Sequence, residues 1–308
     1  MSLLNIEQNI EQILRDTFED ASIVYDRSRF AGGLTNYNYF IEINGKEYIV
    51  REPGVNTEFI IGRHFEQINN DLASKLGINS KCIYFDSETG IKISRRIQSA
   101  ENFAVLDPGS QPCLEQAAAL MRLLHESSSA FPNVFNWRSE LEKYEQIVKS
   151  LRGSLFFNYP ERKEKLLNFI SENTADFSLV PCHNDTVPEN FLMDTSTGKP
   201  FLIDWEYSGM NDASWDVAMY ILESKLSDDA IQSFLTAYYG NSGPDKKSLI
   251  KLKCMCLSQD LLWSIWGIIR HYSGEDFLEY LNMRYDRFSK NLFALMNDIE
   301  YPLCEMVK

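Results

Sequence analysis

The chain has 308 residues, 44% of them hydrophobic and 24% charged, the composition of an ordinary globular protein long enough to form two lobes. Its formal net charge of −14 argues against nucleic acid or an anionic membrane as a partner, because phosphate groups are bound by clustered Lys and Arg. An acidic protein is better suited to a small cationic ligand, although many proteins are acidic for solubility alone.

Several features predict a cytoplasmic protein. The six cysteines are scattered without the spacing of a zinc or redox motif, so we expect reduced and mostly buried thiols. Residues 1–15 combine an amphipathic pattern with acidic side chains and lack the regions of a signal peptide. The most apolar stretch, Leu261–Ile269, is far shorter than the ~20 residues that cross a membrane.

The N-terminal part of the chain has the pattern of a small antiparallel sheet with helices. Asn44-Gly45 is a strong hairpin signal, and Thr57 and Gly77 are typical of the start and the end of a helix. The elements expected from periodicity are a helix within residues 1–15, strands at 37–43, 48–51, 81–85 and 91–97, and a helix at 57–76.

The remainder of the chain has mostly helical patterns. Helices are expected at 114–126, 141–151 and 161–173, and from residue 213 onward with breaks near Ser227, at 240–244 and at Ser273-Gly274. The expected fold class is therefore α+β, with an N-terminal lobe of residues 1–97 and a larger helical lobe of residues 98–308. His125, at the end of one helix, is expected to be a structural hydrogen-bonding residue.

The segment from His183 to Asn190 has the pattern H-x-D-x-x-x-x-N, and Asp204 follows a short apolar run. In kinases with this pattern the first Asp takes the proton of the attacking hydroxyl, while the Asn and the later Asp hold magnesium. We therefore predict Asp185 as the catalytic base, and Asn190 and Asp204 as metal ligands. The alternative is that these side chains only cap turns or a helix.

The apolar runs 191–193 and 200–203 flank the turn-rich stretch 194–199. This pattern predicts a hairpin that brings Asp204 beside Asn190.

Candidate nucleotide ligands lie in the N-terminal lobe. The loop containing Gly32, Gly33, Thr35 and Asn36 lets backbone amides approach a phosphate, although a Gly-Gly pair is more often only a turn. Arg51 on a strand and Glu66 on the following helix occupy the places of the phosphate-binding basic residue and its carboxylate partner in a kinase. Lys46, earlier on the same strand, is the alternative cation, and a surface ion pair is the alternative role.

These motifs resemble those of the choline/ethanolamine kinases, most closely the bacterial choline kinases, within the aminoglycoside-phosphotransferase-like superfamily. The similar segments are 32–36, 63–66, 182–191, 203–208 and 215–216. The resemblance implies a bilobal protein-kinase-like fold, a nucleotide-binding N-terminal lobe, and the use of ATP and Mg²⁺.

Substrate choice is expected to depend on aromatic residues near the C-terminus. Trp263 and Trp266 lie on one helical face, and Tyr280 follows. Two tryptophans at this spacing are more often core residues, but aromatic faces also hold quaternary ammonium groups. The resemblance implies that these three residues form a choline site, with Glu206, Tyr207 and Glu223 as further candidates for its walls.

The sequence therefore predicts a choline kinase that uses ATP and Mg²⁺ and acts as a monomer or homodimer. Its competitors are a kinase of the same fold for ethanolamine, an aminoglycoside or a sugar, and a catalytically inactive kinase-like binding module.

Overall fold

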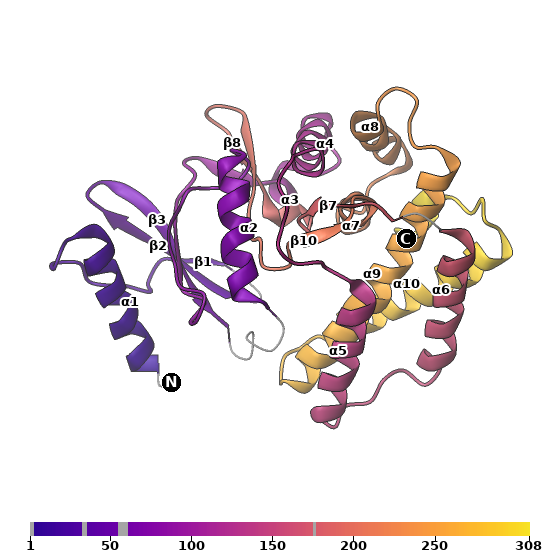
Figure 1. Cartoon of the computed structure of the whole chain (residues 1–308), viewed down its shortest axis with the longest axis horizontal. Coiled ribbons are helices and arrows are strands. Elements are labelled where there is room, and N and C mark those ends of the chain that lie inside the picture. The colour runs from indigo at the N-terminus through magenta and orange to yellow at the C-terminus, as the bar shows by residue number, and fades with distance from the viewer. Residues whose placement is uncertain (1–2, 33–35, 55–60, 175–176) are drawn as a thin grey trace. The chain divides into compact units, whose positions relative to one another are not determined.

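The computed structural model describes residues 3–32, 36–54, 61–174 and 177–308, and the chain divides into two compact units (Figure 1). The first unit comprises Met1–Glu101 and Leu192–Ser208, and the second comprises Asn102–Phe191 and Gly209–Lys308. The functional lobe boundary after residue 97 stays a prediction. The compact units differ from it because residues 192–208 belong with the N-terminal residues.

The first unit contains an antiparallel sheet in the strand order β1-β2-β3-β5-β4. The predicted hairpin joins β2 and β3, and its turn residues Asn44 and Gly45 have φ values of +52° and +69°, as a tight two-residue hairpin turn requires. The helices and strands of this part of the chain are α1 (Leu3–Phe18), β1 (Phe30–Gly32), β2 (Asn36–Ile43), β3 (Lys46–Pro53), α2 (Arg63–Lys75), β4 (Cys82–Phe85), β5 (Lys92–Arg95) and β6 (Ala100–Asn102).

The two faces of this sheet have different chemistry because side chains alternate along each strand. Val50 of β3 packs with Ile10 and Leu14 of α1 in an apolar core. Arg51 lies on the opposite face and contacts Glu66 of α2. The sheet therefore separates a hydrophobic layer from a layer of buried charges.

Helix α2 is shorter than predicted. Ile61 and Gly62 are not helical, and the helix begins at Arg63, because a glycine disfavours the helix interior by about 1 kcal/mol. The predicted cap Thr57 lies outside the described residues. The expected end is confirmed, since Gly77 follows the helix with φ +77°.

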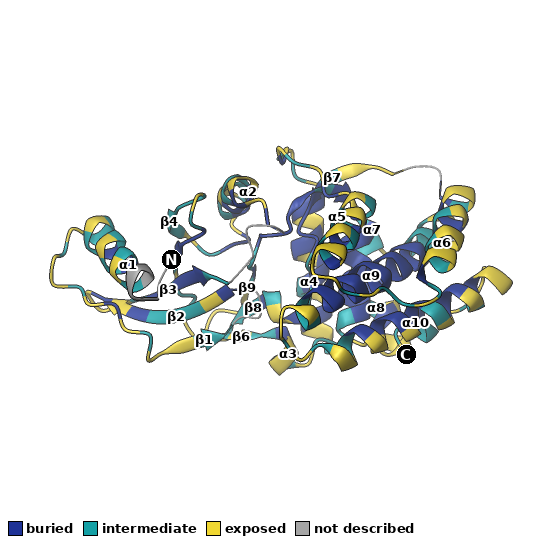
Figure 2. Cartoon of the chain, turned by 90° about the horizontal axis from the view of Figure 1, so that it is seen from below, coloured by how far each residue is buried: buried dark blue, intermediate teal, exposed yellow. Residues whose placement is uncertain are grey.

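The second unit is mostly helical, as expected. Helix α9 is buried on nearly all sides from Leu252 to Ile269, and Figure 2 shows it largely in dark blue. Most of its buried side chains are apolar, as in a core helix, but Lys253 and Asp260 are buried among them. No helix among the described residues is long and apolar enough to cross a membrane. The helices are α3 (Phe103–Leu106), α4 (Gln111–His125), α5 (Trp137–Ser150), α6 (Tyr159–Asn173), α7 (Ser214–Glu223), α8 (Asp228–Tyr239), α9 (Lys246–Tyr272) and α10 (Leu278–Asn297), with the short 3-10 turns η2 (Pro188–Asn190) and η3 (Leu303–Glu305).

In the sequence, the predicted catalytic loop lies between strands of two small sheets. The expected hairpin is present as β8 (Phe191–Asp194) and β9 (Lys199–Leu202), which are neighbours in a sheet with β6. The strands β7 (Leu179–Cys182) and β10 (Gly209–Asp212) pair antiparallel and were not predicted. Both are only four residues long, which is too short for a clear alternating pattern.

Candidate active site

The side chains of Asp185 and Asn190 are in direct contact in the second unit. The amide nitrogen Nδ2 of Asn190 donates to the backbone oxygen of Asp185 at 2.8 Å and to its carboxylate Oδ2 at 3.0 Å. The turn η2 brings the two residues together. Because the nitrogen of the Asn190 amide makes these bonds, its oxygen is the atom that can ligate a cation.

Asp216, in the first turn of α7, holds the backbone of the loop that precedes Asp185. Its carboxylate accepts the backbone N–H groups of His183 at 2.8 Å and of Asn184 at 2.7 Å. Its backbone oxygen also accepts the hydroxyl of Thr186 at 2.7 Å. From the sequence, Asp216 was noted only within the segment 215–216 of the family resemblance, and no role was predicted for it, although it is an acid in the first turn of the helix that follows the motif.

The left-handed conformation of Asn184, with φ +65°, is fixed by further hydrogen bonds. Asn211 donates to its side-chain oxygen at 2.8 Å, and the indole N–H of Trp215 donates to its backbone oxygen at 3.2 Å. A non-glycine residue in this region needs such support. The fold therefore fixes the chain direction immediately before Asp185.

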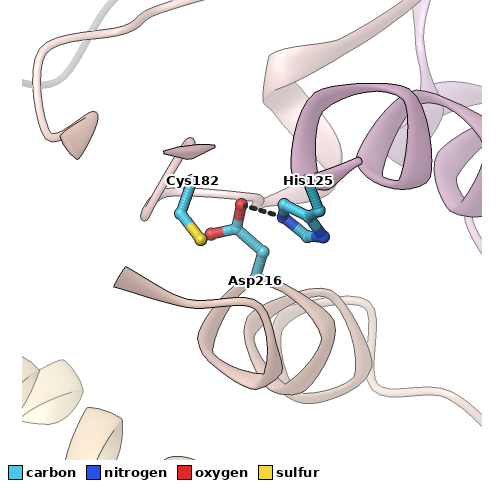
Figure 3. Close-up of side chains that lie close together, drawn as sticks. All are labelled: His125, Cys182 and Asp216. Carbon is cyan, nitrogen blue, oxygen red and sulfur yellow. Dashed lines mark hydrogen bonds and ion pairs between the residues drawn. The ribbon is translucent and has the colours of Figure 1, made fainter. Parts of the chain in front are cut away.

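Figure 3 shows the side chains of His125, Cys182 and Asp216 close together. His125 Nε2 lies 3.0 Å from Asp216, and its Nδ1 lies 2.7 Å from the hydroxyl of Tyr238, which confirms the structural hydrogen-bonding role expected for this histidine. Possible ligand atoms of the three residues lie within 4.8 Å of one another. Burial raises the pKa of Cys182 well above its ordinary value. Asp216 already accepts two backbone amides of the loop and His125 also contacts Tyr238, so these residues support the loop.

In the first unit, Arg51 and Glu66 form a buried ion pair with two hydrogen bonds. Arg51 also donates to the backbone oxygen of Gly90 through Nε at 3.3 Å and Nη2 at 3.0 Å. Lys46 is exposed at the opposite end of β3. Their roles toward a nucleotide stay predictions.

Glu66 is surrounded by cations. Arg63 Nη1 lies 2.8 Å and Lys92 Nζ lies 3.4 Å from its carboxylate. Burial alone raises the pKa of a carboxyl, but the charges of Arg51, Lys92 and Arg63 outweigh it and hold the pKa of Glu66 well below its ordinary value. Lys92 was not identified from the sequence. It lies on β5, opposite Arg51 of β3, and this strand pairing could have indicated its role.

Asn36 and Glu206 extend this network. Asn36 donates to Glu206 at 2.7 Å and accepts from Arg63 at 2.8 Å, and Arg63 lies 3.3 Å from Glu206. Burial and the charge of Asp204 raise the pKa of Glu206 to about 7. Glu206 is thus tied to the start of β2 and to α2.

Asp204 itself follows β9 with φ +66° and is partly exposed. Gly32 ends β1 with φ +107°, whereas Gly33 and Thr35 lie outside the described residues. Tyr207 is buried.

The aromatic candidates of the second unit form one cluster on α9 and α10. The ring centroids of Trp263 and Trp266 are 6.0 Å apart at 87°, and those of Trp266 and Tyr280 are 6.1 Å apart at 73°. Phe277 joins the cluster at 5.3 Å from Trp266 and 5.7 Å from Tyr280. Phe277 was not predicted to belong to this site, although it lies three residues before Tyr280.

Glu223, the last residue of α7, is ion-paired with Arg284 of α10 at 2.5 Å. The same guanidinium lies 5.1 Å from the ring centroid of Tyr280. This acid is therefore connected to the aromatic cluster through an arginine.

The fold and these residues define a phosphotransferase of the kinase-like class. The sequence profile of the phosphotransferase enzyme family (APH) matches residues 26–249, and the chain belongs to this family. It is 32% identical over 272 residues to the LicA protein of Haemophilus influenzae, covering 86% of this chain and 79% of that protein.

Solved structures agree with this assignment. The crystal structure of the choline kinase LicA from Streptococcus pneumoniae is similar with a TM-score of 0.78 and 29% identity, covering 93% of this chain and 99% of that one. A LicA structure in complex with AMP has a TM-score of 0.76 and 30% identity, covering 92% and 98%. The predicted α+β kinase-like fold and the resemblance to bacterial choline kinases are confirmed.

Proposed function

We propose that the protein is a choline kinase that transfers the γ-phosphoryl group of ATP to the hydroxyl of choline and gives phosphocholine. The observation that carries the proposal is the contact of Asp185 with Asn190 in a loop held by Asp216. The choice of choline is supported by the aromatic cluster and by the similarity to LicA, which is described as a choline kinase in Streptococcus pneumoniae.

In this reaction Asp185 orients the choline hydroxyl and accepts its proton as the oxygen attacks the phosphorus atom. Phosphoryl transfer requires mainly positioning and neutralisation of charge. The carboxylate of Asp185 is held by Asn190, and the backbone before it is held by Asp216. It is suited to this task because it is already in position before the substrate binds.

Asn190 and Asp204 supply an amide oxygen and a carboxylate, which are the hard oxygen donors that Mg²⁺ prefers. When bound between these residues and the nucleotide, Mg²⁺ would supply positive charge to neutralise the phosphates. Toward the phosphates we assign the loop with Gly32, Gly33, Thr35 and Asn36, and Arg51 oriented by Glu66. Because four hydrogen bonds already hold Arg51, it acts as a fixed positive charge.

Trp263, Trp266, Phe277 and Tyr280 are the side chains proposed to receive the trimethylammonium group. This group cannot donate hydrogen bonds, and aromatic faces stabilise it by cation–π attraction worth about 0.5–2 kcal/mol per ring. Tyr207 and Glu206 remain weaker candidates for contact with the substrate.

The test is a coupled ADP-release assay with choline, ethanolamine, an aminoglycoside and a sugar as acceptors. We expect the highest kcat/KM with choline, and loss of about 10²–10⁴-fold in kcat for Asp185→Ala, the range for removal of a general base. The exposed Asp71→Ala on α2 is the matched control. Turnover of another acceptor in preference to choline contradicts the substrate assignment, and near-normal turnover by Asp185→Ala contradicts the catalytic role.

A further inference from the structure

A buried group of two acids and two arginines lies next to the aromatic cluster. Asp260 of α9 accepts from Arg287 Nη2 at 2.6 Å and Nε at 2.8 Å, and from Arg284 Nη1 at 3.0 Å. The other nitrogen of Arg284, Nη2, lies 2.5 Å from Glu223 of α7. Three helices are thus joined by one network of ion pairs.

The charges of this network balance, because two carboxylates face two guanidinium groups. The side chains of Asp260 and Arg284 are 1% and 3% exposed, whereas that of Glu223 is 19% exposed. A buried charge without a partner is costly, so Arg284 stays ion-paired with both Asp260 and Glu223. Glu223 is the acid through which the network reaches solvent, and its charge is already neutralised.

The same network contacts the aromatic cluster directly. The Arg284 guanidinium lies 5.1 Å from the ring centroid of Tyr280, one helical turn away on α10. Asp260 lies one turn before Trp263 on α9. Burial raises the pKa of Tyr280 to about 12, so its ring stays an uncharged phenol beside the arginine.

We propose that Arg284 determines selectivity for a quaternary over a primary ammonium substrate, by holding Glu223 away from the substrate cation. The proposal rests on the proposed function. A primary ammonium has three N–H donors that lose their bound water when the substrate binds, so carboxylates must accept these hydrogen bonds instead. A trimethylammonium has no N–H donor to satisfy. An aromatic cation site whose neighbouring carboxylate is already ion-paired with an arginine therefore favours choline over ethanolamine.

The test compares kcat/KM for choline and ethanolamine in the whole protein. In Arg284→Met the side chain keeps an unbranched stem but loses the guanidinium group and so releases Glu223. We expect the ethanolamine-to-choline ratio of kcat/KM to rise about tenfold, the effect of one added hydrogen bond to a charged group. In the double variant Glu223→Gln/Arg284→Met no acid is released, and the ratio should return to within about twofold of the wild type. An unchanged ratio in Arg284→Met, or a shift that persists in the double variant, overturns the proposal.

Glu223→Gln alone keeps the proposal testable if Arg284→Met does not fold, because Glu223 lies at a helix end and is partly exposed. This change leaves Arg284 with excess positive charge, so KM should rise by the same factor for both substrates. A loss confined to ethanolamine would mean that Glu223 binds the ammonium directly, and would refute the role of Arg284. Choline turnover by the wild type tests the proposed function separately, since every result here is a ratio between variants.

Discussion

At the scale of single residues, the two carboxylate oxygens of Asp216 have different partners, and both are donors. The backbone N–H of Asn184 binds Oδ1, and the backbone N–H of His183 binds Oδ2. An amide nitrogen in place of either oxygen would face an N–H group. We expect Asp216→Asn to lower kcat by about 10–100-fold and the free energy of unfolding by about 1–3 kcal/mol, as for a buried donor left without a partner.

Steady-state kinetics and urea unfolding check this expectation. Asp229→Asn, which changes an exposed acid in the first turn of α8, is the control and should alter neither quantity. Equal kinetics for the two variants would show that Asp216 does not position the loop.

Glu66 gives a residue-scale prediction about stability and pH. Its pKa is held below the ordinary value of 4.5, so its contribution to stability is complete above about pH 5 and is lost as the pH falls toward the folded-state pKa. Glu66→Gln leaves three cations without their buried carboxylate and should lower the free energy of unfolding by about 3 kcal/mol at pH 7.

The difference in the free energy of unfolding between wild type and Glu66→Gln should shrink as the pH is lowered from 7 to 4, because the stabilising contribution of the wild-type carboxylate begins to be lost. Urea unfolding at several pH values measures this, with the exposed Glu88→Gln as control. A difference that grows at low pH would contradict the assigned direction of the shift.

At the scale of elements, the close packing of α9 against α10 depends on Gly267. A Cβ atom at this position would lie 2.9 Å from Cβ of Leu281 and 3.2 Å from Cδ1 of Tyr280. Although alanine favours a helix by about 1 kcal/mol over glycine, Gly267→Ala should destabilise the protein by about 1–3 kcal/mol through overpacking.

Because Tyr280 is one of the displaced neighbours, Gly267→Ala should also raise KM for choline while leaving KM for ATP unchanged. Thermal unfolding and kinetics with each substrate varied in turn check both effects. Ser264→Ala on the same helix adds no volume and serves as the control. A rise in both KM values would indicate general damage to the fold.

Elements with a clear local signal were predictable from the sequence. The turn Asn44-Gly45 and the hairpin around residues 194–199 have turn residues between apolar runs, and α9 has a long apolar pattern. Strands β7 and β10 have no such signal, because each needs its partner from another part of the chain to become a strand.

The site was predictable only in part for the same reason. The order of His183, Asp185, Asn190 and Asp204 predicts the chemical roles of the last three from the sequence alone. The bond between Asn36 and Glu206 joins residues 170 positions apart, and the partners of Asp216 and Arg284 likewise come from distant segments. No periodicity or motif spacing encodes such contacts, which only the packing of the chain creates.

At the scale of the whole molecule, the net charge of −14 should influence how substrates reach the protein. A strongly acidic protein attracts cations over distances comparable with the Debye length, roughly 30 Å at 0.01 M salt and 10 Å at 0.1 M. We expect kcat/KM for choline, measured at saturating ATP and Mg²⁺, to fall about two- to threefold between 10 and 300 mM NaCl as this attraction is screened.

The control substrate is 3,3-dimethyl-1-butanol, which has the shape of choline but a carbon in place of the charged nitrogen. Screening acts on the charge alone, so kcat/KM for this alcohol should stay constant over the same range of salt, even though the lost cation–π attraction makes it a poorer substrate. If both substrates respond equally to salt, the effect comes from the nucleotide or from the protein itself. If neither responds, the overall charge serves solubility and the aromatic cluster recognises choline only at short range.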